Sequence, residues 1–204
     1  MTPFTTLTTV ACPLPLSNVD TDQLIPARFM KRSRAEGYGG HLLHDLRFDA
    51  EGRPRPGFPL NDPARQGARI LVARRNFGSG SSREAAVYAL VDYGFACVIA
   101  PSFGDIFASN AVNNGLLPAK VTEADGEALL AALQAGLSEV TVDLEAQAIR
   151  AGDLALAFAI DPVWRTKLLN GWDDLDLTLS HAEAIAGFAA RDARERPWAA
   201  PAPS

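Results

Sequence analysis

Cysteine, histidine and methionine are scarce in this sequence of 204 residues, which contains 2, 3 and 2 of them, respectively. Cys12 and Cys97 lie far apart and form no C-x-x-C pair, so a disulfide framework is not expected. They also supply too few ligands for an iron–sulfur cluster held by this chain alone. His41 and His44 are three residues apart with only Asp45 nearby, and two histidines do not make a zinc site.

An excess of basic charge is also missing. The chain has 24 acidic and 19 basic residues and a net charge of -5, which provides no broad positive surface for a polyanion. Nucleic acid is therefore not an expected partner. No run approaches the roughly 18 apolar residues of a membrane-spanning helix, and the N-terminus lacks the basic start and apolar core of a signal peptide. We expect a cytoplasmic protein with no membrane partner.

The overall composition predicts a single folded domain. Hydrophobic residues make up 48% and charged residues 21% of the chain, as in ordinary soluble domains, and the length suits one domain rather than two. We expect this domain to cover residues 1–196. It is divided into a loop-rich N-terminal part, a βαβ core and a C-terminal set of strands and helices, followed by a frayed Pro/Ala tail: residues 1–68, 69–121, 122–196 and 197–204.

A regular order of elements begins at Arg69. The apolar run 69–73 predicts a strand, the apolar spacing of residues 84–93 predicts a helix that Gly94 ends, and the run 96–100 predicts the next strand. Together they form one βαβ crossover with two neighbouring parallel strands. The following segments predict a helix, a strand, a helix capped by Thr122 and Asp125, two or three antiparallel strands and two final helices: residues 102–115, 116–121, 122–136, 139–160, 161–171 and 180–196. The predicted fold class is α/β, with a mixed sheet flanked by helices.

The loop between the first predicted strand and helix, NFGSGSSREAA at residues 76–86, is rich in glycine and serine. It matches only part of G-x-G-x-x-G because Arg83 stands in the third position, and no Lys-Ser or Lys-Thr pair completes a P-loop. No frame gives the G-x-S-x-G of an esterase. Ser81 and Glu84 have the spacing of a capping box, so one interpretation is a helix cap whose glycines turn the chain.

A second interpretation of this loop is an anion site. A cap needs one hydroxyl, whereas the loop has Ser79, Ser81 and Ser82, and the helix dipole disfavours the cation of Arg83 in the first turn. Free N–H groups, hydroxyls and a guanidinium at the carboxyl end of a strand suit a carboxylate or a phosphate. A serine oxygen there would carry negative charge more easily than in water. The residues alone leave both interpretations open.

Asp20 and Asp22 form a second polar cluster, in the segment NVDTDQLIPARF. Aspartates commonly form turns. They also orient arginines and serines in sites. The residues alone do not decide between these roles.

With these two motifs the sequence resembles a known family, the small subunits of bacterial 3-isopropylmalate dehydratase (isopropylmalate isomerase) in the aconitase superfamily. The matching motifs follow the family's order from Phe4 to Ala190. They are NVDTDQLIP, GYGGHLLHDLRF, NFGSGSSRE, DYGFACVIAPSFGDIF, NNGLLPAKV, VDLEAQ and LNGWDDLDLTL.

The resemblance implies a fold, a reaction and a partner. The fold is the swivelling β/β/α domain of aconitase. The reaction is that of a hydro-lyase, which interconverts 2-isopropylmalate and 3-isopropylmalate through isopropylmaleate in leucine biosynthesis. The partner is a separate large subunit, which carries a four-iron four-sulfur (4Fe-4S) cluster and completes the active site between the two chains. This chain would hold no cofactor, and its small-molecule ligand would be a dicarboxylate.

The resemblance also assigns roles to residues of the glycine-serine loop. Ser81 matches the base that removes a proton from the carbon next to a carboxylate. Ser82 and Arg83 match neighbours that hold a substrate carboxylate. Because such a proton is barely acidic, the charge that builds up on the carboxylate needs strong donors, which an arginine and N–H groups supply.

Further residues are expected to support this loop. Asp22 matches the family's Asp-Thr-Asp segment, and we expect it, with Asp20 and Gly80, to orient the charged groups of the site. A loop that follows this segment in the family presents an arginine to the substrate. Arg32 and Arg34 are the candidates for that contact.

Two departures from the family pattern bear on the substrate. The family has a histidine after the Ser-Ser-Arg-Glu motif, where this chain has Ala85, and its specificity loop reads Thr-Arg-Thr-Gly, where this chain reads SRAEG with Glu36 introduced. A carboxylate near the pocket would repel a dianion unless it pairs with Arg32 or Arg34. Two alternatives therefore stay open: a paralogue that acts on another 2-substituted malate or maleate, such as citraconate or dimethylmaleate, and a non-catalytic partner of the large subunit.

Overall fold

The computed structural model describes residues 1–31 and 33–199, and a seven-stranded sheet forms the centre of this part of the chain. The strand order is β4-β3-β2-β1-β5-β6-β7. β1 to β4 pair in parallel, and β5 to β7 add antiparallel strands beside β1, which confirms the predicted mixed sheet. The strands are β1 Thr6–Leu14, β2 Ile70–Ala73, β3 Cys97–Ala100, β4 Leu117–Lys120, β5 Glu139–Asp143, β6 Ala148–Ala151 and β7 Leu154–Ala157.

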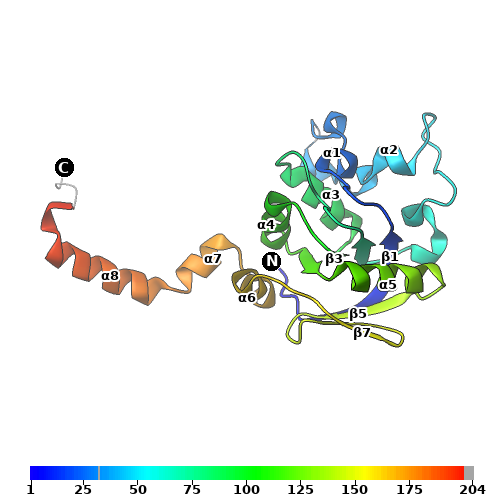
Figure 1. Cartoon of the computed structure of the whole chain (residues 1–204). Helices are drawn as coiled ribbons and strands as arrows, with labels where there is room; N and C mark the ends of the chain where they lie inside the picture. Colours follow the sequence, from blue (N-terminus) through cyan, green and yellow to red (C-terminus); the bar gives the residue numbers. More distant parts are fainter. Residues whose placement is uncertain (32, 200–204) are drawn as a thin grey trace.

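Helices cover the parallel part of the sheet on both faces. Figure 1 shows α1 to α4 on one side of these strands and α5 on the other. The α-helices of the described residues are α1 Thr21–Leu24, α2 His44–Arg47, α3 Glu84–Tyr93, α4 Asp105–Asn113, α5 Glu123–Gln134, α6 Pro162–Asn170, α7 Asp174–Leu179 and α8 Ala182–Glu195. The 3-10 turns are η1 Ala27–Phe29, η2 Arg34–Glu36, η3 Gly39–His41, η4 Pro59–Asn61, η5 Pro63–Arg65 and η6 Pro197–Ala199. None of these helices is long and apolar enough to cross a bilayer.

Alternate residues of β2 and β3 face two separate hydrophobic cores. Every residue of both strands is buried, as expected of parallel strands covered on both faces. Leu71 and Val98 belong to the core shared with α1, α3 and α4, whereas Ile70 and Cys97 belong to the core shared with α5. β2 precedes α3 in the sequence, β3 follows it, and the two strands pair in parallel, which confirms the predicted βαβ crossover.

The remaining order is also largely confirmed. α4, β4 and α5 follow β3 in the predicted sequence, and Thr122 caps α5 by accepting the Asp125 N–H at 3.1 Å. β5, β6 and β7 form the predicted antiparallel addition.

The prediction of a loop-rich part over residues 1–68 missed β1, which is nine residues long and lies in the middle of the sheet. Thr6 to Val10 pair antiparallel with β5, and Ala11 to Leu14 pair in parallel with β2. Pro13 argues against a central strand, because it has no N–H to donate. The backbone nitrogen of Pro13 points to the same side of β1 as the N–H of Ala11, which donates to Ser138 and not to β2. On that side the pairing with β5 ends at Val10, so the sheet needs no N–H from position 13.

After β7 the described chain has three α-helices where two were predicted, because α7 was missed. Asp173 starts α7 by accepting the N–H groups of Leu175 and Asp176, and the Asp176 side chain accepts the Asp173 N–H in return. In Figure 1, α7 and α8 run away from the rest of the molecule. We call the segment Asp174–Ala199 the C-terminal arm. Of the predicted frayed tail, Pro197–Ala199 form η6, and the rest lies outside the described residues.

Candidate active site

The two polar motifs lie side by side at the carboxyl edge of β1 and β2. The Gly78 N–H donates to Val19 O at 2.7 Å, and the Thr21 N–H donates to Ser79 O at 2.9 Å. The hydroxyl of Thr21, which is 2% exposed, donates to Ser81 O at 2.9 Å. The pairing of β1 and β2 is thereby extended into their loops, at the edge where parallel sheets usually bind ligands.

Glycines set the path of the glycine-serine loop. Gly78 has a φ of +71° and Gly80 a φ of +94°, values that favour glycine. A Cβ atom on Gly78 would overlap the ring of Phe107. Phe77 beside it is fully buried and makes edge contacts with the rings of Phe103 and Phe107. The base of the loop is therefore fixed, and its tip, Gly80 to Ser82, is exposed.

The predicted capping box of Ser81 and Glu84 is wrong. α3 begins at Glu84 with Arg83 as its N-cap residue, and among the described residues no side chain caps it. The reason is a long-range contact: Thr21 holds the Ser81 carbonyl and the Arg83 N–H donates to it at 2.8 Å, so the chain enters the helix two residues later. The Ser81 hydroxyl has no hydrogen-bond partner in residues 1–31 or 33–199. The first N–H groups of α3 and the Ser81 hydroxyl are consequently available to an anion.

The two aspartates have separate roles. Asp20 caps α1: its Oδ1 accepts the Gln23 N–H at 2.7 Å, and its own N–H donates to Gln23 Oε1 at 3.4 Å. Asp22 forms an ion pair with Arg83, whose Nη1 donates to the Asp22 carboxylate. Thus Asp20 is a turn former whose Cβ lies beside Gly80, whereas Asp22 contacts the charged group of the loop.

Of the two candidate arginines in the N-terminal loop, Arg32 lies outside the described residues, and Arg34 lies against α3. The guanidinium carbon of Arg34 is 3.6 Å from the centre of the Tyr88 ring, and its Nη2 is 3.8 Å from Asp92 Oδ1. Asp92 also accepts the Tyr38 N–H at 2.9 Å, so it ties this loop to the helix. Arg34 thus contacts the helix that begins at the candidate site, about one and a half to two and a half turns after Arg83.

Glu36 and Ala85, the residues that depart from the family pattern, have structural contacts. Glu36 accepts the Ser33 N–H at 3.3 Å and Ser33 caps η2, so Glu36 closes a capping box. Ala85 is half-buried and packs against the core beneath α3.

The sequence analysis did not single out two residues that support the loop. One is Thr21, which holds the Ser81 carbonyl. The other is Asn114, whose Nδ2 donates to Glu84 Oε1 at 2.9 Å and to Asn110 O at 2.9 Å. Thr21 stands between the two aspartates, so its motif was noticed, but the contact spans 60 positions and no local pattern signals it.

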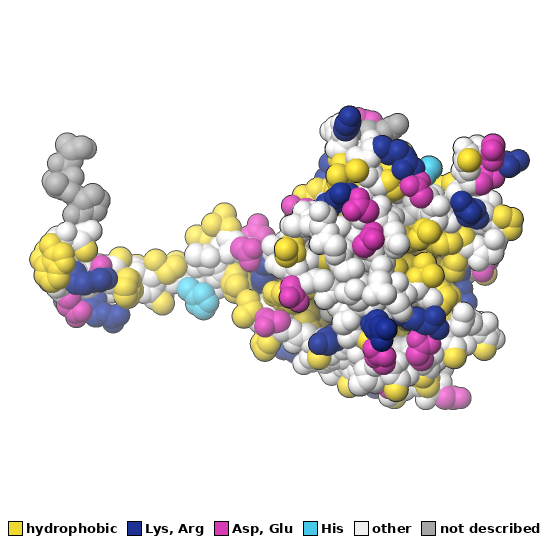
Figure 2. All heavy atoms as spheres, turned by 45° about the horizontal axis from the view of Figure 1, so that its top comes forward, with side chains coloured by type: hydrophobic (Ala, Val, Ile, Leu, Met, Phe, Trp, Pro, Cys, Tyr) yellow, Lys and Arg dark blue, Asp and Glu magenta, His cyan; other side chains and the backbone are white. Residues whose placement is uncertain are grey.

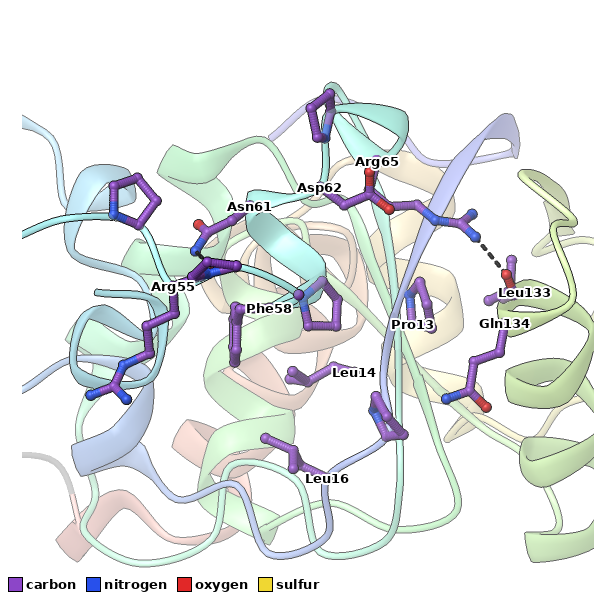
Figure 3. A pocket seen from close by; sticks show the side chains of 16 residues that line it. Pro13, Leu14, Leu16, Arg55, Phe58, Asn61, Asp62, Arg65, Leu133 and Gln134 are labelled. Carbon is purple, nitrogen blue, oxygen red and sulfur yellow. Dashed lines mark hydrogen bonds between the residues drawn. The ribbon is translucent and has the colours of Figure 1, made fainter. Parts of the chain in front are cut away.

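A pocket of about 710 Å³ lies elsewhere. Figure 3 shows it between the end of β1, the proline-rich loop around Phe58 and the end of α5. At the rim of this pocket, the guanidinium of Arg65 donates hydrogen bonds to the carbonyls of Ala11, Leu133 and Leu137. Neither the glycine-serine loop nor Asp22 lines this pocket, so it is a poorer candidate for carboxylate chemistry than the loop.

The two cysteines do not suit an iron–sulfur cluster. Burial raises the pKa of Cys12 to about 12, although Arg65 opposes the shift, and burial also raises the pKa of Cys97. The two side chains also belong to different hydrophobic cores and are at most 1% exposed, so they do not meet at one site. Within residues 1–31 and 33–199, no group of three or more His, Cys, Asp or Glu side chains is arranged to hold a metal ion.

Three family models match successive parts of the chain. The model described as Aconitase C-terminal domain matches residues 1–124, and the model LeuD_N matches residues 127–162. A third, which describes the C-terminal domain of the 3-isopropylmalate dehydratase small subunit, matches residues 174–202, which include the C-terminal arm.

Individual relatives agree with these models. The chain is 51% identical over 201 residues to the 3-isopropylmalate dehydratase small subunit of Rhodospirillum centenum, which covers 98% of this chain and 99% of that one. It is 47% identical to the protein of the same name from Shouchella clausii over 84% of this chain and 87% of that one. A crystal structure of 3-isopropylmalate dehydratase from Methanocaldococcus jannaschii matches with a TM-score of 0.62 at 24% identity, over 90% of this chain and 99% of that one. The predicted resemblance and fold class are thus confirmed.

Proposed function

The chain belongs to the family of 3-isopropylmalate dehydratase small subunits, and from that premise we propose that its glycine-serine loop forms this subunit's share of the active site. The enzyme is a hydro-lyase of leucine biosynthesis, which interconverts 2-isopropylmalate and 3-isopropylmalate by removing water and adding it back. The observation that carries the assignment is the open end of α3. It brings together, at one sheet edge, the Ser81 hydroxyl, to which no described residue bonds, N–H groups that no described side chain caps, and the Arg83–Asp22 pair.

Arg83 is our candidate for holding a substrate carboxylate. A guanidinium has five N–H donors, and only Nη1 is bound to Asp22, so a face remains for a bidentate contact with a carboxylate. The Asp22 carboxylate fixes the direction of that face. The N-terminus of α3 adds positive potential at the same place. Ser82 is exposed beside Arg83 and would add a hydroxyl donor.

Ser81 is our candidate for the base. In the dehydration direction, its oxygen takes the proton from the carbon next to a carboxylate, so that the C–H bond breaks and an O–H bond forms on Ser81. The electron pair of the C–H bond becomes the double bond of isopropylmaleate while the C–O bond breaks and hydroxide leaves. Arg83 and the N–H groups of α3 stabilise the charge that develops on the carboxylate, and the same groups favour the ionised form of Ser81.

The departing hydroxide needs a Lewis acid, and the described residues of this chain include no site for one. Cys12 and Cys97 do not suit a cluster, so we assign the 4Fe-4S cluster, and with it a Lewis acid for the hydroxide, to the large subunit. The exposed loop tip agrees with a site that a second chain covers.

The test is to mix the purified chain with its large subunit, reconstituted without oxygen, and to follow the absorbance of isopropylmaleate. We expect isopropylmalate to be turned over. Turnover of citraconate or dimethylmaleate in its place would assign the paralogue function. Large-subunit binding without turnover of any of these acids would assign the non-catalytic role.

A further inference from the structure

The C-terminal arm carries a helix that the body formed by the described residues does not cover. α8 has 14 residues, and each of them is exposed except Asp192, which is partly exposed. Isolated helices of this length are marginal in water, because most helical stability in proteins comes from packing of an apolar face. α8 has no such packing in the described part of the chain. A surface that another molecule provides would therefore stabilise it.

The arm has an apolar face that fits such a surface. Ile185, Ala189 and Ala193 recur at helical spacing, with Phe188 beside them, while Glu183 and Arg194 lie on the other side of α8. Arg191 borders the apolar face, with its guanidinium carbon 5.6 Å from the centre of the Phe188 ring. Ile185 is 50% and Phe188 54% exposed. Apolar side chains continue along the arm at both ends, and Figure 2 shows them exposed along its length; they are Leu175, Leu179 and Trp198. Exposed apolar surface that is extended in this way marks a contact site.

The first residue of the arm, Asp174, which we call its root, is fixed to the body beside the candidate active site. Lys167, only 3% exposed, donates to Asp174 at 2.5 Å and also to Asn113. Asn113 in turn donates to the other oxygen of Asp174 at 3.2 Å. The next residue, Asn114, donates to Glu84, which follows Arg83. The arm and the glycine-serine loop thus share one support, the end of α4.

We propose that the arm is a docking element for the large subunit, which it grips with the apolar face of α7 and α8. This inference rests on the proposed function. The shared support favours the large subunit over a second copy of this chain, because a partner that covers the exposed loop tip at Gly80 to Ser82 also lies beside the root of the arm. The match of residues 174–202 to a domain model specific to the small subunit points the same way. The arm binds the partner, and the loop does the chemistry.

The experiment compares two full-length variants with equal changes of charge. Ile185→Asp/Phe188→Asp places two carboxylates on the apolar face, and Arg194→Asp makes the same net change on the polar side. We expect the first variant to raise the dissociation constant for the reconstituted large subunit by at least about tenfold, and the second to raise it by less than about threefold. Both variants should melt at the temperature of the unaltered chain, since neither site is buried.

Turnover separates this inference from the proposed function. At saturating large subunit the Ile185→Asp/Phe188→Asp variant should recover the turnover rate of the unaltered chain, whereas Ser81→Ala should bind normally and not turn over. Equal affinities of the two arm variants would overturn the docking role. A self-associated chain that the apolar-face variant dissociates, seen by light scattering, would assign the face to a second copy instead. Inactivity of the unaltered pair would refute the proposed function and leave the binding result valid.

Discussion

α3 and α8 are both helices with an apolar face, but they meet different surroundings. On α3 the apolar residues Ala86, Val87, Ala89 and Leu90 are 0% exposed, and the helix is held on the sheet with its N-terminus at the glycine-serine loop. On α8 the matching face is open to solvent. The same sequence pattern therefore has two outcomes: one face builds the body that positions the glycine-serine loop, and we propose that the other binds the large subunit. The following changes test that division.

The largest effect is expected for Ser81→Ala. If Ser81 is the base, turnover of isopropylmalate should fall by about 10²- to 10⁴-fold, the usual contribution of a positioned base. The affinity for the large subunit should be unchanged. The matched control is Ser138→Ala just before β5, an exposed residue outside both the glycine-serine loop and the arm. It should leave the turnover rate within about twofold. A surviving rate in Ser81→Ala would mean that the base is another group.

The next largest effect is expected on the free energy of unfolding, when a leucine is changed to alanine in the body and in the arm. Leu90→Ala removes a fully buried side chain and should lower the free energy of unfolding by about 2 to 5 kcal/mol. Leu179→Ala in α7, where the side chain is 59% exposed, should change it by less than about 0.5 kcal/mol. Urea denaturation of the isolated chain measures both. A large loss for Leu179→Ala would show that the arm packs on the body of its own chain.

The sequence predicted the elements that local patterns define better than those that depend on contacts between residues far apart in the chain. β2, α3 and β3 were predicted because each is a local pattern: two short apolar runs, and a helical spacing that ends at Gly94. β1 was missed because its pairing decides it. Four of the five residues from Thr6 to Val10 are β-branched, which favours a strand, but Pro13 argues against a central one. The place of the strand in the sheet is fixed by partners near residues 70 and 140.

The site shows the same limit. The capping box was wrong because Thr21 holds Ser81 across 60 positions. The pairing of Asp22 with Arg83 spans 61 positions, and the residues alone left the role of Asp22 open. The resemblance to a family supplied the site residues, because a family motif records long-range contacts that composition and spacing do not. The exposed face of the arm appeared only with the structure, since nothing in the sequence of α8 indicates that the rest of the described chain leaves it uncovered.

A smaller effect is expected for Gly187→Ala in α8. A Cβ atom there would meet no other atom within 4 Å, so the change should act through helix propensity alone and favour the helix by about 1 kcal/mol. Far-ultraviolet circular dichroism of the isolated chain should show added helix. Gly78→Ala is the contrast in the body: with a φ of +71° and Phe107 in the way, it should destabilise the chain. A neutral Gly78→Ala would mean that the loop is looser than its contacts indicate.

The smallest effect is a pH dependence at the root of the arm. The hydrogen bond from Lys167 lowers the pKa of Asp174 below its ordinary value of 3.8. A carboxyl group whose pKa is lowered by folding stabilises the folded state above the ordinary value, and this contribution is lost as the pH falls through the lowered value. We therefore expect the root to be tight at pH 5 and to loosen only below about 3.8, by a small amount since Asp174 is 74% exposed. Backbone relaxation of α7, measured by nuclear magnetic resonance at both pH values, detects the change. Asp174→Asn should remove the pH dependence there; if it persists in that variant, another carboxylate holds the arm.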